Sequence, residues 1–81
     1  MMGRAATKAT VLRLTRERLR RGWSKAELAR RARVDQGLVS KIELRRVNPY
    51  PVELARIARA LRVPVRRAVT LLDEVREVVM A

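Results

Sequence analysis

The amino-acid sequence predicts an all-α domain of five helices. Apolar residues recur at spacings of three and four along most of the chain, which is the period of an amphipathic helix. Gly22 and the prolines at positions 49, 51 and 64 divide this pattern into helix-length segments, and no segment predicts a strand. With 81 residues, the chain is long enough for one helical core and too short for two.

The N-terminal segment is predicted to be an arm followed by the first helix. Residues 1–9 lack an apolar period, so we expect a flexible basic arm. A helix is then predicted from about residue 10 to residue 21, where Gly22 supplies the stop. The residues of this helix predicted to face inward are Val11, Leu14 and Leu19.

Two short helices are predicted next, in a helix-turn-helix over residues 24–44. Ser24 and Glu27 have the spacing of a capping box, in which the hydroxyl accepts from the amide of residue 27 and the carboxylate from that of residue 24. Asp35 is the predicted N-cap of the second helix, which runs from residue 36 to about 44. The inward residues of the pair are predicted to be Leu28, Ala29, Ala32, Val39 and Ile42.

The C-terminal part predicts two more helices. Pro51 suits the first turn of a fourth helix, and Pro64 precedes a fifth over residues 65–81. The apolar residues of the fourth are Leu54, Ile57, Ala58 and Leu61. In the fifth, Val65, Val69, Leu72, Val75 and Val79 recur at helical spacing, although the core needs only the first two or three. We therefore expect a dimer interface on this extended helix, at Leu72, Val75 and Val79; the alternative is a frayed tail.

The composition favours a nucleic-acid-binding protein over an enzyme. The chain has 20 Lys and Arg against 8 Asp and Glu, for a net charge of +12, and such a field attracts a polyanion. The alternative explanation of the charge alone is solubility. There is no cysteine and no histidine, so we expect no catalytic residues, no metal site and no cofactor. No apolar run is long enough for a membrane span, which makes a cytoplasmic protein the default expectation.

The helix predicted over residues 36–44 is the candidate reader of DNA. Once Val39 and Ile42 are buried, its exposed face holds Gln36, Gly37, Ser40 and Lys41. Glutamine can bind adenine through two hydrogen bonds and lysine can donate to guanine, whereas glycine permits close approach. The alternative is a solvated helix face without a ligand.

The order of motifs from Leu14 to Leu72 resembles the phage repressor and Cro family of helix-turn-helix domains. The matching residues include Gly22-Trp23-Ser24-Lys25, Glu27-Leu28-Ala29, Val34-Asp35-Gln36, Val39-Ser40-Lys41-Ile42-Glu43 and Asn48-Pro49. The resemblance implies a five-helix, lambda-repressor-like DNA-binding domain over residues 10–72 that is usually a dimer on a two-fold-related operator. It also places recognition residues at the positions of Gln36, Gly37 and Lys41, with Ser40 between them.

The resemblance assigns roles to further residues. Lys25 matches a family position at the start of the second helix, where it can reach a phosphate. Phosphate contacts are also expected from Arg45, Arg46 and the amide of Asn48 because of their place in the loop after the candidate reading helix, and such contacts fix the register without reading sequence. A salt bridge in the family joins the positions of Arg18 and Glu43, and we expect it to position the helices. The family favours glycine where this chain has Arg33, Arg45 and Arg62, so either those caps are not left-handed or their cost is tolerated.

The leading functional hypothesis is a homodimeric transcriptional regulator that binds double-stranded DNA, with repression through a palindromic operator preferred over activation through polymerase. An antitoxin that binds a toxin partner and regulates its own operon is a second hypothesis, since the family includes such proteins. A basic RNA-binding protein is a third, although the exposed Gln36 and Lys41 argue against it.

Overall fold

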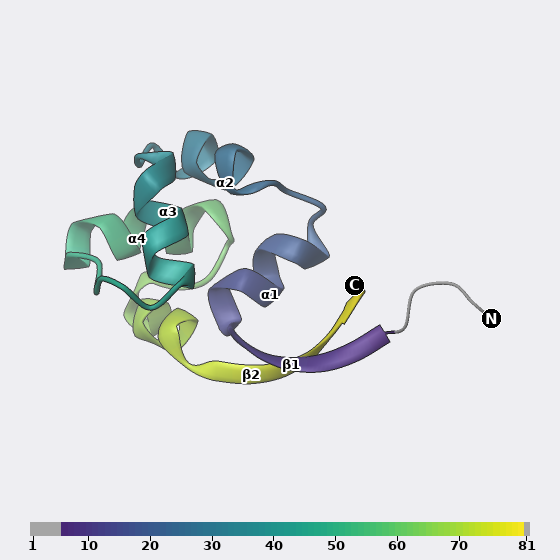
Figure 1. Ribbon diagram of the computed structural model, residues 1–81. Helices are drawn as coiled ribbons and strands as arrows, with labels where there is room; N and C mark the ends of the chain where they lie inside the picture. The colour runs from purple at the N-terminus through teal and green to yellow at the C-terminus, as the bar shows by residue number, and fades with distance from the viewer. Residues whose placement is uncertain (1–5, 81) are drawn as a thin grey trace.

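Helices form most of the structure, and one pair of strands joins the two ends of the chain. The computed structural model describes residues 6–80, and the side chains of residues 9–77. In chain order the elements are β1 (Ala6–Leu12), α1 (Arg13–Arg20), α2 (Lys25–Ala32), α3 (Gln36–Glu43), α4 (Pro51–Ala60), the 3₁₀ helix η1 (Val65–Leu72) and β2 (Glu74–Met80) (Figure 1). No helix in this described part of the chain is long and apolar enough to cross a membrane.

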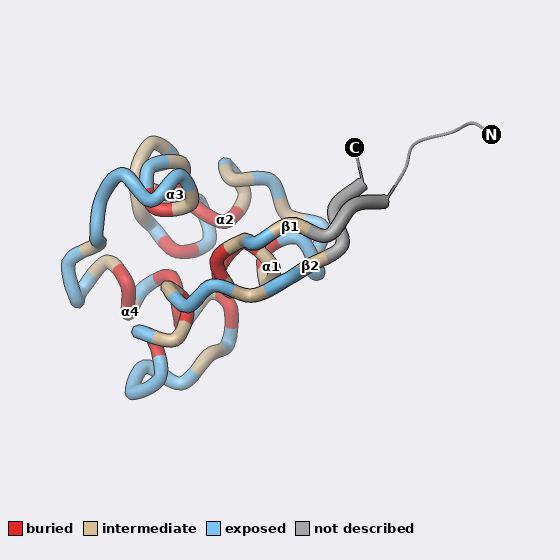
Figure 2. The backbone as a smooth tube through the Cα atoms, turned by 60° about the horizontal axis from the view of Figure 1, so that its bottom comes forward, coloured by how far each residue is buried: buried red, intermediate tan, exposed pale blue. Residues whose placement is uncertain are grey.

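The helices pack around one apolar core, formed by the inward faces of α1 to η1 (Figure 2). Its largest fully buried side chains are Leu14, Leu28, Val39, Ile42, Ile57, Leu61 and Leu71. Leu12, at the end of β1, and Leu54 also contribute to it. Leu19, predicted to face inward, is instead 45% exposed, because Thr15 and Arg18 occupy the buried face of α1.

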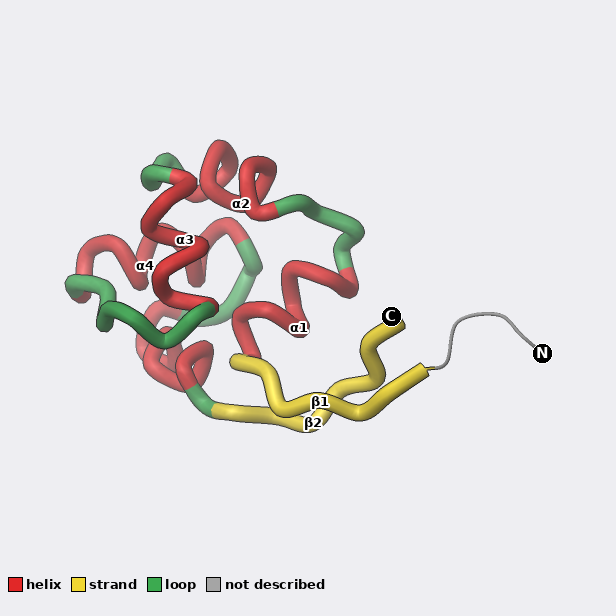
Figure 3. The backbone as a smooth tube through the Cα atoms, in the orientation of Figure 1, coloured by secondary structure: helices red, strands yellow, loops and turns green. Residues whose placement is uncertain are grey.

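The all-α prediction is wrong at the ends of the chain. β1 and β2 pair antiparallel, from Ala6 opposite Met80 to Leu12 opposite Glu74, and lie side by side below α1 in Figure 3. The segments are rich in Thr and Val, whose β-branched side chains favour strands. A strand forms backbone hydrogen bonds with a second strand, and here the two strands are far apart in the sequence.

The strand pair replaces part of the predicted arm. Residues 6–9 of the segment 1–9 belong to β1, and residues 1–5, with Arg4, lie outside the described residues. Consequently α1 begins at Arg13, three residues later than the predicted start of the domain at residue 10.

The predicted C-terminal helix over residues 65–81 is also wrong. A 3₁₀ helix covers residues 65–72, Asp73 adopts an extended conformation, and its carbonyl accepts a hydrogen bond from the amide of Arg13 at 2.8 Å. This hydrogen bond lies where the chain passes from η1 to β2. Ala68 and Leu71 are the buried residues of η1, whereas Val65 and Val69 are exposed.

The helical stripe proposed as a dimer interface is therefore not present in this form. Leu72 is half-buried and packs against the core. Val75 is half-buried on β2, opposite Val11. The side chain of Val79 lies outside the described residues, although its backbone pairs with Thr7.

Three arginines adopt left-handed backbone conformations at or just after helix ends. Their φ angles are 57° at Arg33 after α2, 59° at Arg45 after α3 and 59° at Arg62 after α4. The phage repressor and Cro family favours glycine at these positions. A residue with a side chain lowers stability there by about 1 kcal/mol relative to glycine. Of the two alternatives considered for these positions, the second holds: the backbone is left-handed at all three, and the protein tolerates the loss of stability.

Candidate nucleic-acid interface

Residues 24–44 form two short helices joined by a tight turn. α2 ends at Ala32, and the left-handed Arg33 directs the chain toward α3. In this turn the amide of Val34 donates to the carbonyl of Ala29 at 3.0 Å, and the half-buried Val34 side chain packs against the core. The turn therefore fixes the orientation of α3 relative to α2.

The N-terminus of α2 carries Lys25, one of the expected phosphate-binding residues. The Ser24 hydroxyl oxygen accepts a hydrogen bond from the amide of Glu27 at 3.0 Å, which forms one half of the predicted capping box. The Glu27 carboxylate instead accepts from Arg30 and Arg31. These hydrogen bonds, that from Arg30 first, hold the pKa of Glu27 below its usual range. Lys25 is half-buried at the first position of α2, and the N-terminus of a helix favours an anion such as phosphate.

The N-terminus of α3 is capped by Asp35. Oδ2 of Asp35 accepts a hydrogen bond from the amide of Gly37 at 2.8 Å. A Cβ added at residue 37 would lie 2.7 Å from the same oxygen. Glycine at this position therefore leaves room for the capping carboxylate, in addition to the close approach to a ligand predicted for it.

α3 presents one polar face after its apolar face is buried. Val39 and Ile42 are 0% and 1% exposed, so the helix cannot rotate about its axis without opening the core. The four predicted base-contacting residues come to the other side of the helix: Gln36 and Lys41 are exposed, and Gly37 and Ser40 are half-buried. The structure thus brings these four residues together on one short surface.

The C-terminus of α3 is held by α1. Arg18 donates to both carboxylate oxygens of Glu43, from Nε at 2.7 Å and from Nη2 at 2.9 Å. The two side chains are 10% and 6% exposed, so this is a buried, two-pronged ion pair. The remaining nitrogen, Nη1, donates to the carbonyl of Trp23 at 2.9 Å. With Asp35 at one end and Arg18 at the other, α3 is fixed at both termini.

The loop after α3 carries the other expected phosphate-binding residues. Arg45, Arg46 and Asn48 are all exposed. Arg45 is engaged within the protein: Nε donates to Oε2 of Glu74 at 2.9 Å, and Nη2 donates to the Thr10 carbonyl at 3.4 Å. Its partners are a residue of β2 and a residue of β1, so this arginine joins the loop after α3 to the strand pair.

Sequence reasoning missed Glu74 and Thr10 as neighbours of this surface. Glu74 follows Arg45 by 29 positions, and no local spacing signals their contact. The Thr and Val content of the two segments is a signal for strands, but it does not show that the strands pair with each other or that they lie beside the loop.

A protein-family model described as helix-turn-helix matches residues 12–67, which is more than half of the chain. The chain belongs to the Cro/C1-type helix-turn-helix family. A comparison with curated proteins finds no match.

Membership of the Cro/C1-type family indicates the general function of the domain. The family match supports a DNA-binding regulator of transcription whose partner is double-stranded DNA. The match spans α1 to α4 and the first residues of η1, and therefore includes the helix-turn-helix and both termini of α3. β2 lies outside the matched residues, so the strand pair is a feature that the family match does not describe.

Proposed function

We propose that this Cro/C1-type protein is a sequence-specific repressor that binds a palindromic operator as a homodimer and acts by binding, without catalysis. The observation that carries the proposal is the fixed exposure of α3. Asp35 caps one end, the buried Arg18–Glu43 pair holds the other, and the face between them carries Gln36 and Lys41. A rigid donor and acceptor array is what direct reading of base edges requires.

In this proposal the residues around α3 divide into two groups. Those on the polar face of α3 read base edges in the major groove: Gln36, Gly37, Ser40 and Lys41. Those on either side of α3 bind backbone phosphates: Lys25, Arg45, Arg46 and Asn48. Arg45 first exchanges Glu74 for a phosphate oxygen. Both side chains of that pair are about half exposed, and such a surface pair contributes only about 0–1 kcal/mol, so a phosphate competes with it.

We place the dimer contact at the strand pair. One recognition helix reads only a few base pairs, and a second copy doubles the sequence that is read. An isolated two-stranded sheet is marginally stable, and each of its strands leaves one edge free for another strand. A second copy of the same strand pair satisfies these edges through a two-fold-symmetric contact.

The test of DNA reading is selection of bound duplexes from a random pool. We expect a two-fold-symmetric sequence whose half-sites are centred about one helical turn, ~34 Å, apart. Competition between the selected duplex and RNA of the same length checks the class of nucleic acid. Failure to enrich any sequence, or stronger binding to RNA, would overturn the proposal.

The test of dimerisation is sedimentation of the protein, free and bound to the selected duplex. We expect two copies per duplex, and loss of that stoichiometry when Val75 and Val79 on β2 are both changed to Asp. Circular dichroism checks that the variant keeps its helices. A wild-type protein that occupies the duplex as a single copy would exclude the homodimer, and a stoichiometric toxin that co-purifies with it would favour the antitoxin alternative.

A further inference from the structure

A second basic surface lies between α2 and α4, away from the recognition helix. It contains two adjoining hollows, of about 370 and 620 Å³, which share three lining residues, Arg31, Arg59 and Ala60. The first hollow is completed by Ala32, Arg33 and Arg56, and the second by Arg21, Trp23 and Arg62. We call these nine residues the arginine cleft. None of them belongs to α3 or to the loop after it.

The arginine cleft contains positive charge that the protein does not neutralise. Six of its nine residues are arginine and none is acidic. Arg21 and Arg31 have carboxylate partners in Glu17 and Glu27. Among the residues whose side chains the structure describes, no salt bridge involves the other four: Arg33, Arg56, Arg59 and Arg62. Four like charges on one small surface repel each other and attract an anion of comparable charge.

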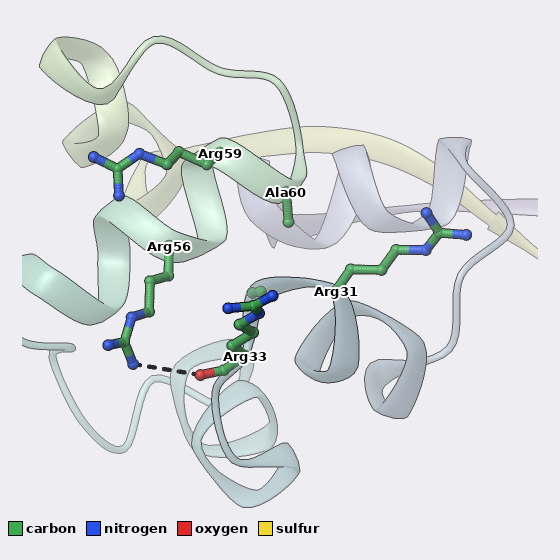
Figure 4. A pocket seen from close by; sticks show the side chains of 6 residues that line it. Arg31, Arg33, Arg56, Arg59 and Ala60 are labelled. Carbon is green, nitrogen blue, oxygen red and sulfur yellow. Dashed lines mark hydrogen bonds between the residues drawn. The ribbon is translucent and has the colours of Figure 1, made fainter.

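The shape of the first hollow suits a compact ligand. Its two alanines have only a methyl group as side chain, whereas its four arginines are long (Figure 4). In Figure 4 the side chains of Arg31, Arg56 and Arg59 spread away from one another, and Arg56 donates from Nη1 to the Arg33 carbonyl at 3.4 Å. Arginine side chains are long and flexible, so those that line the hollow can turn inward onto an anion. A volume of a few hundred Å³ is the size of a small-molecule site.

Backbone conformation gives independent support. Arg33 and Arg62 occupy left-handed positions where glycine costs less, and both line the arginine cleft. The C-termini of α2 and α4 favour a positively charged residue nearby, but this does not explain why the arginine stands at the left-handed position itself. The third arginine of this kind, Arg45, lies in the loop beside the recognition helix, where an anion is also expected.

We propose that the arginine cleft binds a compact oligophosphate, a small anion that carries several linked phosphate groups. The planar guanidinium group of arginine presents paired donors that match phosphate oxygens. Four arginines without a carboxylate partner line the two hollows, and once turned inward they match several linked phosphates better than a single one. The site is separate from the polar face of α3, so the binding of oligophosphate does not depend on the proposed function; only the duplex measurement below rests on it.

The test measures binding of inorganic tripolyphosphate by equilibrium dialysis at constant ionic strength. Trp23, the single tryptophan of the chain, lies under the guanidinium group of Arg31, with 4.4 Å between Cζ and the ring centre. Its fluorescence therefore reports whether the bound anion is at the arginine cleft. We expect saturable binding at micromolar to millimolar concentration, with a change in Trp23 emission that follows the dialysis curve.

Two matched variants locate the site. Arg33→Gly and Arg45→Gly each remove one charge from a left-handed position that glycine accepts without strain, so both are expected to keep the fold. Arg33→Gly should weaken tripolyphosphate binding fivefold or more, and Arg45→Gly less than twofold. For a random-sequence DNA duplex, Arg45→Gly should lose more affinity than Arg33→Gly. Arg59→Gln, an exposed change within α4, provides a second variant that should also lose tripolyphosphate.

Four outcomes would overturn the proposal. The first is no binding of tripolyphosphate by the wild type at 1 mM or below, a limit of about −4 kcal/mol in binding free energy. The second is an equal loss in Arg33→Gly and Arg45→Gly, which would mean that the anion follows only the net charge. The third is a loss of duplex binding in Arg33→Gly as large as in Arg45→Gly, which would assign the cleft to the DNA surface. The fourth is tighter binding of polyglutamate than of tripolyphosphate, which would indicate an acidic protein partner.

Discussion

Arg18 on α1 and Glu43 at the end of α3 form a two-pronged ion pair across 25 residues of sequence, with donor–acceptor distances of 2.7 and 2.9 Å. Every nitrogen of the Arg18 guanidinium group has an acceptor, since Nη1 binds the Trp23 carbonyl. A buried charge pair contributes little net stability when it replaces apolar packing, but losing one partner leaves the other charge buried. The pair therefore fixes where α3 ends relative to α1.

Arg18→Ala should lower the free energy of unfolding by about 3–5 kcal/mol, because it leaves the Glu43 carboxylate buried without a partner. Arg18→Lys should recover only part of this loss, because lysine cannot bind both carboxylate oxygens in the same geometry. Urea denaturation measures both changes. The control is Arg20→Ala on the same helix, where the arginine is 57% exposed and a change below about 1 kcal/mol is expected. Equal midpoints for the two alanine variants would contradict the role of the pair.

Gly37→Ala should destabilise the protein by about 1 kcal/mol, because the added Cβ displaces the Asp35 carboxylate and α3 loses its cap. The same substitution in an Asp35→Ala background should become stabilising, since alanine favours a helix over glycine by about 1 kcal/mol and no carboxylate remains to be displaced. Thermal denaturation of the four proteins tests this reversal of sign. If the effects of the two substitutions on stability were additive, the Asp35 cap would not explain why residue 37 is glycine.

Gln36→Ala should relax sequence preference at one position of each half-site. Loss of a base contact costs about 1–3 kcal/mol at that position and leaves the others unchanged. Arg46→Ala should instead weaken binding to all sequences and reduce the salt dependence by about one phosphate contact. Selection from a random pool and titrations at several salt concentrations distinguish the two effects. An unchanged sequence preference in Gln36→Ala would show that Gln36 does not contact a base.

Glu74→Gln should strengthen DNA binding about two- to fivefold at low salt. The substitution removes the internal competitor for the Arg45 guanidinium group, an exposed pair of about 0–1 kcal/mol. Glu77→Gln is the matched control, because it makes the same change in charge on the same strand but its partner is Arg20 at 3.8 Å. Fluorescence anisotropy with a labelled duplex measures both. Equal strengthening by the two variants would mean that net charge, and not the release of Arg45, is responsible.

Glu17 provides a prediction for pH dependence. The hydrogen bond from Arg21 at 2.9 Å, above all, lowers the pKa of Glu17 from its usual value of 4.5. A carboxyl group whose pKa is lower in the folded state adds stability above its unfolded pKa and loses it as the pH falls through the folded value. The difference in unfolding free energy between wild type and Glu17→Gln should therefore be constant at neutral pH and shrink below pH 4.5. A difference that is the same at pH 7 and pH 3 would exclude this contribution.

The sequence predicts the helical part of the fold because its signals are local. Ser24, Asp35 and Pro51 mark helix starts through their own side chains, and the residues that fill the core recur at helical spacing. The polar face of α3 follows from the burial of Val39 and Ile42. These features depend on residues within one or two turns of each other.

The strand pair could not be predicted in this way because each strand depends on the other. The segment Glu74–Met80 has valines at spacings of three and four, so its pattern also fits a helix. Its conformation is decided by pairing with Ala6–Leu12, which no periodicity within either segment reports. The contact of Arg45 with Glu74 escapes prediction for the same reason.

The pairing of β1 with β2 has a consequence for the order of events during synthesis. Among the elements of residues 6–80, β1 leaves the ribosome before the helices and β2 after them, yet Leu12 must pair with Glu74. Closing so long a loop costs more entropy than forming the local contacts of α1 to α4, so the helices are expected to pack first. The nascent chain thus presents α3 while β1 still exposes both of its edges, and the later pairing with β2 covers one of them.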